Sequence, residues 1–415
     1  MTSLRRVQIL AAMLFGGIVV SYLLVAPKVY NDPEGADFST FYTASTLVQR
    51  GQSRQLYDWD SQTRVQSEFS PDAAARHLAL PYMRPPFEAL LLLPLSFLPY
   101  REAFEIWIAL SLVLIAVTAA LLHWRIQELR RIPWWLYYLA VFSYGPVAHG
   151  LALGQDHALL FLCFALVLIF LREGKDFAAG CCLGFALIKF QIVLPFLLVL
   201  LLKRQWRVLR GFAAIAVISV SIGVWLLGWC GALAYPVYLW RLNQMRASAG
   251  IYPSIMPNLR GLLQGWRSPW SASLGLDITT GLFSLALVFW VAREWNAAAP
   301  RDSRTYSAGL AAAFLGTIVA GYHVFSFDLC LLFPVALLAA SLGWHNRELD
   351  WTTRVLLLAG AAALLFGPLY LLLTAAARLN LLALVLLWLT WAFLRAIAVW
   401  RSEEFMPSQV ALPAR

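Results

Sequence analysis

Asp37 has the sequence surroundings that best suit proton-transfer chemistry. It lies in the stretch GADFSTFYTAS at 35–45, shortly after the first long apolar run. A carboxylate placed there could act as a general base that removes a proton from a hydroxyl group. The residues after it have the pattern of a short amphipathic helix, so the carboxylate could instead cap that helix. The residues alone leave both roles open.

Lys189 and two groups in YHVFSFD, at 322–328, are polar side chains inside or beside apolar sequence. A lysine at bilayer depth costs about 2.5–3.5 kcal/mol. Lys189 could extend its ammonium to the membrane surface, or it could balance a phosphate in a cavity. His323 could be a satisfied core histidine. Asp328, at membrane level, points more strongly to function.

GQDH, at 154–157, stands where one apolar run ends and the next begins. Asp156 could cap the helix that follows. The segment 230–273 contains no acid but has many aromatic residues, which are partly typical of an interfacial belt. It also carries four arginines, which favour a surface for an anionic ligand. These are Arg241, Arg246, Arg260 and Arg267, and Arg84 before Pro85-Pro86 adds another cation.

Composition sets the class of protein. The chain of 415 residues is 61% hydrophobic and 13% charged, with a mean hydropathy of +0.69. Globular proteins are about 45–50% apolar and about 25% charged, so we expect an all-α polytopic membrane protein. The net charge of +10 is spread over several loops. This pattern favours a positive-inside topology and argues against nucleic acid as a partner.

We expect one integral-membrane domain, 1–415, with about twelve spans. The first is an uncleaved span at 7–26. A periplasmic loop with interfacial helices follows at 27–100, further spans of a catalytic half at 101–229, a periplasmic Arg/Trp-rich loop at 230–273, and C-terminal spans at 274–400. The later spans are expected near 101–124, 133–149, 156–172, 176–189, 190–203, 208–229, 274–293, 305–322, 324–343, 354–374 and 378–400.

Two segments decide the topology. ALLLLPLSFLP, at 89–99, has two prolines and is too short for the ~20 residues of a span. Counting it as a span would also move most arginines to the outer side, so we predict an interfacial helix there and cytoplasmic termini. The segment 176–203 is flanked by basic residues at both ends, which favours a hairpin with Lys189 at its tip. Each arm would reach only ~21 Å, so the tip would line a cavity below the outer surface.

This topology gathers Asp37, GQDH, Lys189, the 230–273 segment and YHVFSFD on the outer face, which predicts a single outward-facing site. No Walker loop, GxGxxG or HExxH motif occurs in the sequence. Enzymes and pumps that depend on those motifs are therefore disfavoured. A transporter would often show charged relays buried mid-helix, or broken helices in paired halves.

The ordered set of motifs resembles glycosyltransferase family 87 over about residues 7 to 345. The motifs are GADFSTFYTAS, LYDWD, RPPFEALLLLPLSFLPY, GQDHALL, GFALIKFQIVLPFLLVLL, MPNLRGLL and YHVFSFDLCLL. The resemblance implies a C-type glycosyltransferase fold in the bacterial inner membrane, with the active site on the periplasmic side. It implies a polyprenyl-phosphate sugar donor, most typically mannose, a glycolipid or cell-envelope glycan acceptor, and neither a nucleotide nor an essential metal.

The resemblance also implies roles for residues. Asp37 matches the family's base. Contacts to the donor phosphate or sugar are expected from Lys189, His323, Arg84, Arg260, Gln155, Gln191, Asn258 and Asp328, and contacts to the acceptor or pocket from Tyr42, Asp156, His157 and Tyr322. The chain departs from the family pattern at Arg84, at Asp156-His157 and at Arg260, which leaves the sugar and the acceptor open.

The expected reaction is a single displacement with inversion. Asp37 deprotonates the acceptor hydroxyl, which attacks the anomeric carbon, while Lys189 and loop arginines stabilise the departing phosphate. The alternative is a non-catalytic carrier or flippase for lipid-linked sugars that uses the same cationic cavity.

Overall fold

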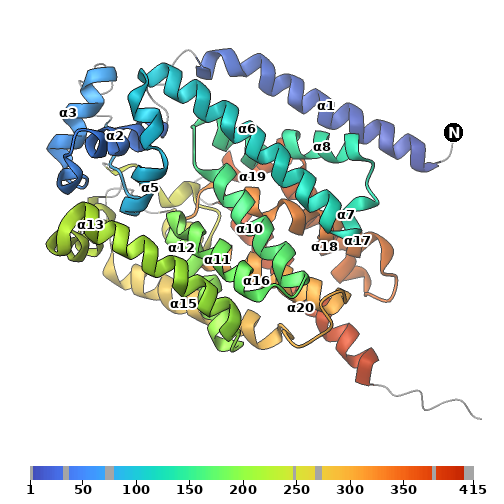
Figure 1. Cartoon of the computed structure of the whole chain (residues 1–415). Helices are drawn as coiled ribbons and strands as arrows, with labels where there is room; N and C mark the ends of the chain where they lie inside the picture. The colour runs from blue at the N-terminus through green and yellow to red at the C-terminus, as the bar shows by residue number, and fades with distance from the viewer. Residues whose placement is uncertain are drawn as a thin grey trace, which may run out of the picture.

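The protein is built from helices alone within the residues that its computed structural model describes, 3–30, 37–70, 79–245, 249–266, 273–375 and 380–405. The all-α prediction is therefore confirmed for these ranges. Figure 1 shows the short helices α2, α3 and α5 grouped at one end of the molecule, which the long helix α13 also reaches.

The N-terminal half contains one long helix, a set of short ones and then a run of apolar helices. In order they are α1 (Ser3–Tyr30), α2 (Phe38–Gln49), η2 (Ser53–Gln55), α3 (Trp59–Phe69), α5 (Pro86–Leu91), η3 (Leu93–Phe97), α6 (Tyr100–Arg125), α7 (Gln127–Arg130), α8 (Trp134–Ser143), α9 (Gly145–Ala152) and α10 (His157–Arg172). The elements written η are 3₁₀ helices.

The C-terminal half continues the apolar helices. They are α11 (Asp176–Phe185), η4 (Ala186–Lys189), α12 (Phe190–Leu202), α13 (Trp206–Met245), η6 (Pro253–Ile255), α14 (Leu259–Gln264), α15 (Leu274–Glu294), α16 (Arg304–Ala320), η7 (Ser326–Leu332), α17 (Phe333–His345), α18 (Trp351–Leu365), α19 (Gly367–Ala375) and α20 (Leu381–Phe405).

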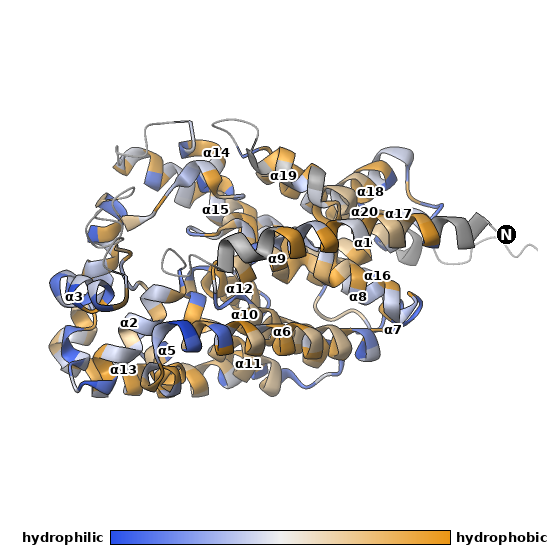
Figure 2. Ribbon diagram, turned by 90° about the horizontal axis from the view of Figure 1, so that it is seen from above, coloured by the Kyte–Doolittle hydropathy of each residue, from blue (hydrophilic) through white to orange (hydrophobic). Residues whose placement is uncertain are grey.

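Six stretches of the described chain are long and apolar enough to cross a bilayer, so this is a multi-pass membrane protein. They are Tyr100–Arg125, Asp176–Leu202, Trp206–Met245, Leu274–Glu294, Ser326–His345 and Leu381–Arg401. Three shorter apolar helices, Gln8–Leu24, His157–Arg172 and Trp351–Leu365, add to them. Figure 2 shows hydrophilic residues gathered around α3 and α5, whereas the long helices are mostly hydrophobic. The predicted count of about twelve spans stays a prediction.

The segment 89–99 forms no spanning helix. It folds as the end of α5 and as η3, and Leu91 and Phe97 are 51% and 67% exposed. Exposed apolar side chains on elements this short suit a membrane interface, which agrees with the predicted interfacial helix.

The segment 176–203 has the predicted hairpin arrangement. Asp176 pairs with Arg301, and Lys203 lies close to Glu294, so both ends are near the connection between α15 and α16. Lys189 lies at the other end, beside Asp328. Both arms pack against α13, and in addition α11 packs against α10 whereas α12 packs against α15 and α16. Length alone would permit a single crossing, but the contacts at both ends show that the chain turns back.

The segment 230–273, predicted as a loop between spans, is helical over its first third. Helix α13 continues through residue 245, with a break at Gly228, where φ is 71° and ψ is 169°. A residue with a side chain rarely adopts this φ, so glycine permits the break. Trp229 and Trp240, beyond it, are 71% and 60% exposed, as expected for a helix lying at a membrane interface. The sequence predicts the end of a span at residue 229, and the break in the helix at Gly228 lies beside that position.

Helices α11 and α13 approach each other so closely that only glycine fits at their crossing. A Cβ atom on Gly180 would lie 1.9 Å from the carbonyl oxygen of Val208, and one on Gly211 would lie 2.0 Å from that of Phe177. Both obstacles are backbone atoms, which cannot rotate away. This crossing fixes α11, and through η4 it fixes the position of Lys189.

We predict that Gly180→Val destabilises the protein by about 1–3 kcal/mol or more, because the helices must separate. The matched control is Gly281→Val in α15, where a Cβ would meet no atom within 4 Å. Thermal unfolding of both variants in detergent checks this. Equal unfolding temperatures for the two variants would contradict the proposed close crossing.

Candidate active site

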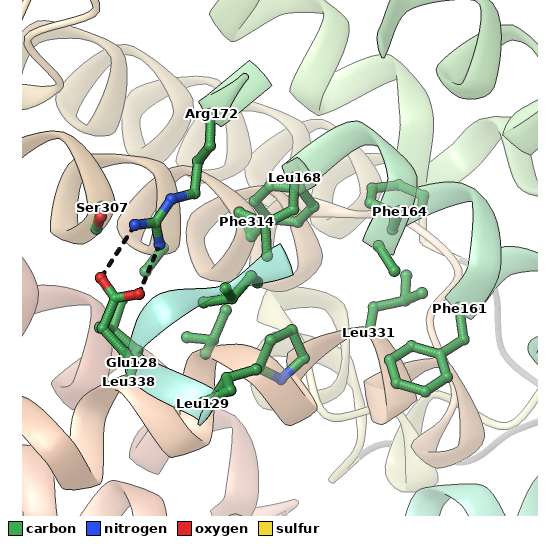
Figure 3. A pocket seen from close by; sticks show the side chains of 15 residues that line it. Glu128, Leu129, Phe161, Phe164, Leu168, Arg172, Ser307, Phe314, Leu331 and Leu338 are labelled. Atoms are coloured by element: carbon green, nitrogen blue, oxygen red, sulfur yellow. Dashed lines mark hydrogen bonds and ion pairs between the residues drawn. The ribbon is translucent and has the colours of Figure 1, made fainter. Parts of the chain in front are cut away.

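A small apolar cavity between α7, α10, α16 and α17 has no group suited to catalysis. Its volume is about 40 Å³, and Phe161, Phe164 and Phe314 contribute to its walls (Figure 3). Its two charged lining residues, Glu128 and Arg172, are paired with each other through hydrogen bonds of 3.0 and 3.2 Å. With the charges satisfied at the rim, the cavity offers no free acid, base or nucleophile among its described lining residues.

A second cavity, of about 260 Å³, holds a mixed set of charged, polar and aromatic side chains. It brings together five residues that the sequence predicts for the site, from five separate segments. They are Asp37, Arg84, Gln155, Lys189 and His323. The remaining lining is largely apolar and consists of Thr40, Phe41, Leu80, Pro81, Met83, His149, Leu153, Ala249, Gly250, Tyr252, Ile255, Phe325, Ser326 and Phe327.

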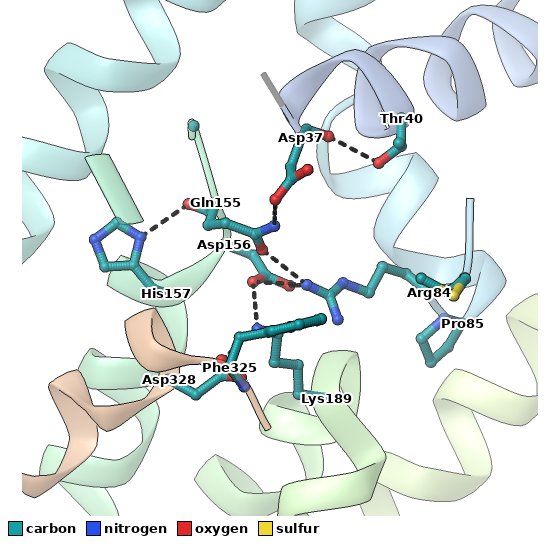
Figure 4. Close-up of polar contacts among 12 residues, drawn as sticks. Asp37, Thr40, Arg84, Pro85, Gln155, Asp156, His157, Lys189, Phe325 and Asp328 are labelled. Atoms are coloured by element: carbon teal, nitrogen blue, oxygen red, sulfur yellow. Dashed lines mark hydrogen bonds and ion pairs between the residues drawn. The ribbon is translucent and has the colours of Figure 1, made fainter. Parts of the chain in front are cut away.

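Asp37 occupies the N-cap position of α2 but does not cap it. Its side chain makes no hydrogen bond to the first turn, and instead Oδ2 accepts a hydrogen bond of 2.5 Å from Nε2 of Gln155 (Figure 4). Asp58, at the start of α3, shows the contrast, since its carboxylate accepts from the backbone amide of Ser61 at 2.9 Å. The capping alternative for Asp37 is therefore wrong.

Asp156 likewise occupies the N-cap position of α10 without capping it. Its carboxylate accepts a hydrogen bond of 3.0 Å from Nη2 of Arg84 and lies 3.6 Å from Nζ of Lys189. The side chain is fully buried. Two cations compensate this one acid, so Asp156 holds the network together (Figure 4).

Lys189 is 1% exposed, so its ammonium does not extend to the membrane surface, and that alternative is wrong. Nζ donates to Oδ1 of Asp328 and lies 4.2 Å from the centre of the Phe327 ring. The other oxygen of Asp328 accepts from the backbone amide of Phe325 at 2.9 Å. Arg84, Asp156, Lys189 and Asp328 thus form a chain of alternating charges, of which Arg84 and Lys189 line the cavity.

The surroundings shift the pKa values of the groups that lie outside the membrane-spanning segments. Burial raises the pKa of Asp37, and the Gln155 hydrogen bond and the charge of Arg84 offset only part of that. Burial also acts to raise the pKa of Asp156, but Arg84 and Lys189 more than compensate, so it lies below its usual value. Burial and then Arg260 hold the pKa of His323 well below its usual range. Arg84 and Lys189 therefore favour the charged form of Asp156, while the raised pKa of Asp37 makes it the acid that takes up a proton more readily.

Several predicted site residues have structural partners instead of lining the cavity. The hydroxyl of Tyr42 donates to the Leu98 carbonyl at 2.7 Å. Asn258 caps α14 by accepting from the amide of Gly261 at 2.8 Å, and it donates to the Gly321 carbonyl at 2.7 Å. Neither side chain has a polar atom left over for a ligand in this arrangement.

Four more of the predicted site residues are absent from the cavity lining, namely His157, Arg260, Tyr322 and Gln191. His157 is fully buried and Nδ1 lies 3.2 Å from the Gln155 carbonyl oxygen. Arg260 is stacked 4.2 Å above the ring of Tyr322 and donates to Asn243. Gln191, in α12, is half-buried and outside the lining.

The predicted arginine surface of the 230–273 segment does not form in the described residues. Arg241, in the C-terminal part of α13, is exposed, and Arg260 is buried. Arg246 and Arg267 lie outside the described residues. The segment instead contributes small and apolar residues to the cavity, among them Gly250 and Tyr252.

The sequence does not predict three polar residues that lie in the cavity lining or beside the charged network. His149 lines the cavity, with Nδ1 2.7 Å from Oγ of Ser326. Its sequence signal is its position just before GQDH, at the end of the same apolar run. Glu88 is 1% exposed, and burial, followed by the nearby charge of Asp156, raises its pKa well above the usual range. Thr40 lines the cavity too, and its hydroxyl donates to the carbonyl of Asp37 at 2.8 Å.

Comparison with known proteins gives one match. The sequence profile described as glycosyltransferase family 87 matches residues 82–321. None of the curated proteins and none of the solved structures matches the chain. The matched range includes Arg84, Gln155, Asp156 and Lys189, whereas Asp37 lies before it.

We predict that Asp156→Asn destabilises the fold by about 3–5 kcal/mol, because it leaves two buried cations with less compensation. The control is Glu68→Gln, which breaks the solvent-exposed pair of Glu68 with Arg50, made of hydrogen bonds of 2.6 and 2.7 Å. That change should cost less than about 1 kcal/mol. Unfolding in detergent measures both, and an equally small effect at Asp156 would contradict its role as the network's centre.

Proposed function

The chain belongs to glycosyltransferase family 87, and on that premise we propose that it moves a sugar, mannose in the first instance, from a polyprenyl-phosphate donor to a lipid-linked or cell-envelope glycan acceptor. The reaction takes place at the periplasmic face of the bacterial inner membrane, in a C-type glycosyltransferase fold. The observation that carries the proposal is Asp37, a carboxylate that lines the cavity and does not cap its helix.

The reaction is a single displacement. Asp37 takes the proton of an acceptor hydroxyl as its oxygen bonds to the anomeric carbon of the donor sugar. The bond between that carbon and the phosphate oxygen breaks, and polyprenyl phosphate leaves with the electron pair. The attack inverts the configuration at the anomeric carbon. A raised pKa suits this role, since a base with a pKa closer to neutral takes up the proton more readily.

The leaving phosphate needs positive charge and hydrogen-bond donors. Arg84 and Lys189 line the cavity and lie on the same wall, joined through Asp156. Each already shares its charge with an acid, so we propose that they stabilise the phosphate by reorienting within the network, not as free cations. His323 is held neutral by its surroundings and serves as a hydrogen-bond partner for the phosphate or sugar.

The apolar part of the cavity suits the lipid part of the donor. Met83, Ile255 and Phe325 contribute to that part of the lining. The exposed side chains of Leu91 and Phe97 place an apolar surface on the neighbouring short elements α5 and η3. A polyprenyl chain entering from the bilayer would thus meet hydrophobic residues before its phosphate reaches Arg84 and Lys189.

We predict that Asp37→Asn lowers transfer by about 10²–10⁴-fold, because it removes the base. The assay supplies purified protein in detergent with short-chain polyprenyl-phosphate mannose and glycolipid acceptors, and follows release of polyprenyl phosphate. A panel of glucose, galactose and arabinose donors identifies the sugar.

The matched control is Asp58→Asn in the cap of α3 outside the cavity, which should keep most of the activity because Asn caps a helix about as well as Asp. If Asp37→Asn turns over as fast as wild type, the assignment of the base is wrong. If wild type consumes no donor but moves it between the leaflets of a vesicle, the protein is a carrier.

We also predict that the transfer rate falls as the pH falls through the pKa of Asp37, because only the ionised carboxylate accepts a proton. That pKa is raised, so the acid limb lies above the ordinary value of about 3.9. The ratio kcat/KM between pH 4 and pH 8 measures it, with tryptophan fluorescence confirming that the protein stays folded. A rate that is unchanged down to pH 4 would contradict the prediction.

A further inference from the structure

We propose that Gln155 is a positioning residue that keeps Asp37 ionised and aimed at the acceptor, rather than a contact to the donor. The inference rests on the proposed function and deepens it. Gln155 touches both Asp37 and Arg84 through its two amide atoms, with hydrogen bonds of 2.5 and 3.0 Å. Both amide atoms of Gln155 are therefore engaged within the protein, one with the proposed base and one with Arg84.

The neighbours fix the direction of the amide. The guanidinium of Arg84 can only donate hydrogen bonds, so the atom of Gln155 that faces it must be the oxygen. The NH₂ end must then point to Asp37, where a donor favours the carboxylate over the carboxylic acid. Arg84 therefore acts on Asp37 in two ways, through its charge and through the orientation of Gln155.

The backbone around Gln155 is held in place as firmly as its side chain. The amide of Gln155 donates to the Gly150 carbonyl at 2.9 Å, and Nε1 of Trp107 donates to the Gly154 carbonyl at 2.8 Å. Gly154 has φ +62°, and a Cβ there would lie 2.8 Å from Phe38 and from Phe104. Glycine is needed at this position both for its backbone angle and for the close contact.

The same segment is tied directly to the helix that carries Asp37. The amide of Phe38, the residue after Asp37, donates to the Leu153 carbonyl at 3.2 Å. Asp37 and Gln155 are therefore anchored to each other by the backbone as well as by the side chains. With Oδ2 of Asp37 bound to Gln155, Oδ1 is the oxygen we expect to meet the acceptor hydroxyl.

The test is the pH dependence of transfer in Gln155→Ala and Gln155→Glu, measured as kcat/KM in the full-length protein. Gln155→Ala removes the N–H group that donates to Asp37, so the acid limb, the pH range in which kcat/KM falls, should move upward by about one pH unit. At a pH below this limb, kcat/KM should be up to tenfold lower than in wild type. Gln155→Glu keeps the acceptor for Arg84 but places a second acid against Asp37. It should move the limb further, because two adjacent carboxylates share a proton.

The control is Gln66→Glu. Gln66 is a buried glutamine in α3 that pairs with the backbone of Leu80 at 2.8 and 3.1 Å and is not among the groups that shift the pKa of Asp37. The Gln66→Glu variant should have lower stability or a lower rate, but the acid limb of its kcat/KM profile should stay at the wild-type pH. The charged groups that act on Asp37, namely Arg84, Lys189 and His149, remain in all three variants.

The outcomes separate the two proposals. If wild type transfers sugar and both Gln155 variants lose rate equally at every pH, or keep the wild-type limb, Gln155 does not set the pKa of Asp37 and this inference is wrong. If wild type transfers no sugar, the proposed function itself fails. An upward shift that is larger for Gln155→Glu than for Gln155→Ala supports the positioning role.

Discussion

The buried carboxylate of Asp156 is the interaction on which the site depends. It lies between Arg84, from the segment before α5, and Lys189, from the tip of the 176–203 hairpin. A buried charge is tolerated only when it is compensated, so these segments must meet at this point for the fold to be stable. Asp328 adds the last charge and brings in the start of η7. Four regions of the chain are thus joined by electrostatics at the end of a bundle that is otherwise held by apolar packing.

This arrangement separates two kinds of acid within a short distance. Asp156 and Asp328 compensate cations and serve the structure. Asp37 has the amide of Gln155 as its direct partner among the described residues, and burial raises its pKa. A carboxylate in that state can exchange a proton without breaking the network that supports it. The proposed chemistry therefore uses Asp37, a base with no salt bridge among the described residues. The cations beside it, Arg84 and Lys189, do form salt bridges.

The sequence predicted much of this and failed in specific places. The apolar runs gave the helices and the membrane class, and the flanking arginines gave the hairpin that carries Lys189. The motif order brought Asp37, Arg84, Gln155, Lys189 and His323 to one cavity. Capping could not be judged from sequence, because Asp37, Asp58 and Asp156 all precede helices, yet only Asp58 bonds to its own first turn.

The remaining failures have physical causes as well. The end of the apolar run near residue 229 predicted a loop, but the chain continues as a helix to Met245 because its exposed tryptophans suit a membrane interface. The sequence predicts Asn258 and Arg260 as ligand contacts. In the structure Asn258 bonds to the Gly321 carbonyl, and Arg260 bonds to Asn243 and stacks on Tyr322. A local sequence pattern does not reveal these contacts. Three-dimensional proximity, which no local pattern encodes, also brings His149 and Glu88 next to the predicted residues.

The most direct measurement of the central claim is the anomeric configuration of the product. Purified protein in lipid nanodiscs would be given a polyprenyl-phosphate sugar of known configuration and an acceptor, and the product would be examined by NMR. A single displacement driven by one base predicts release of polyprenyl phosphate with inversion at the anomeric carbon. Retention of configuration would require a different mechanism and would contradict the account.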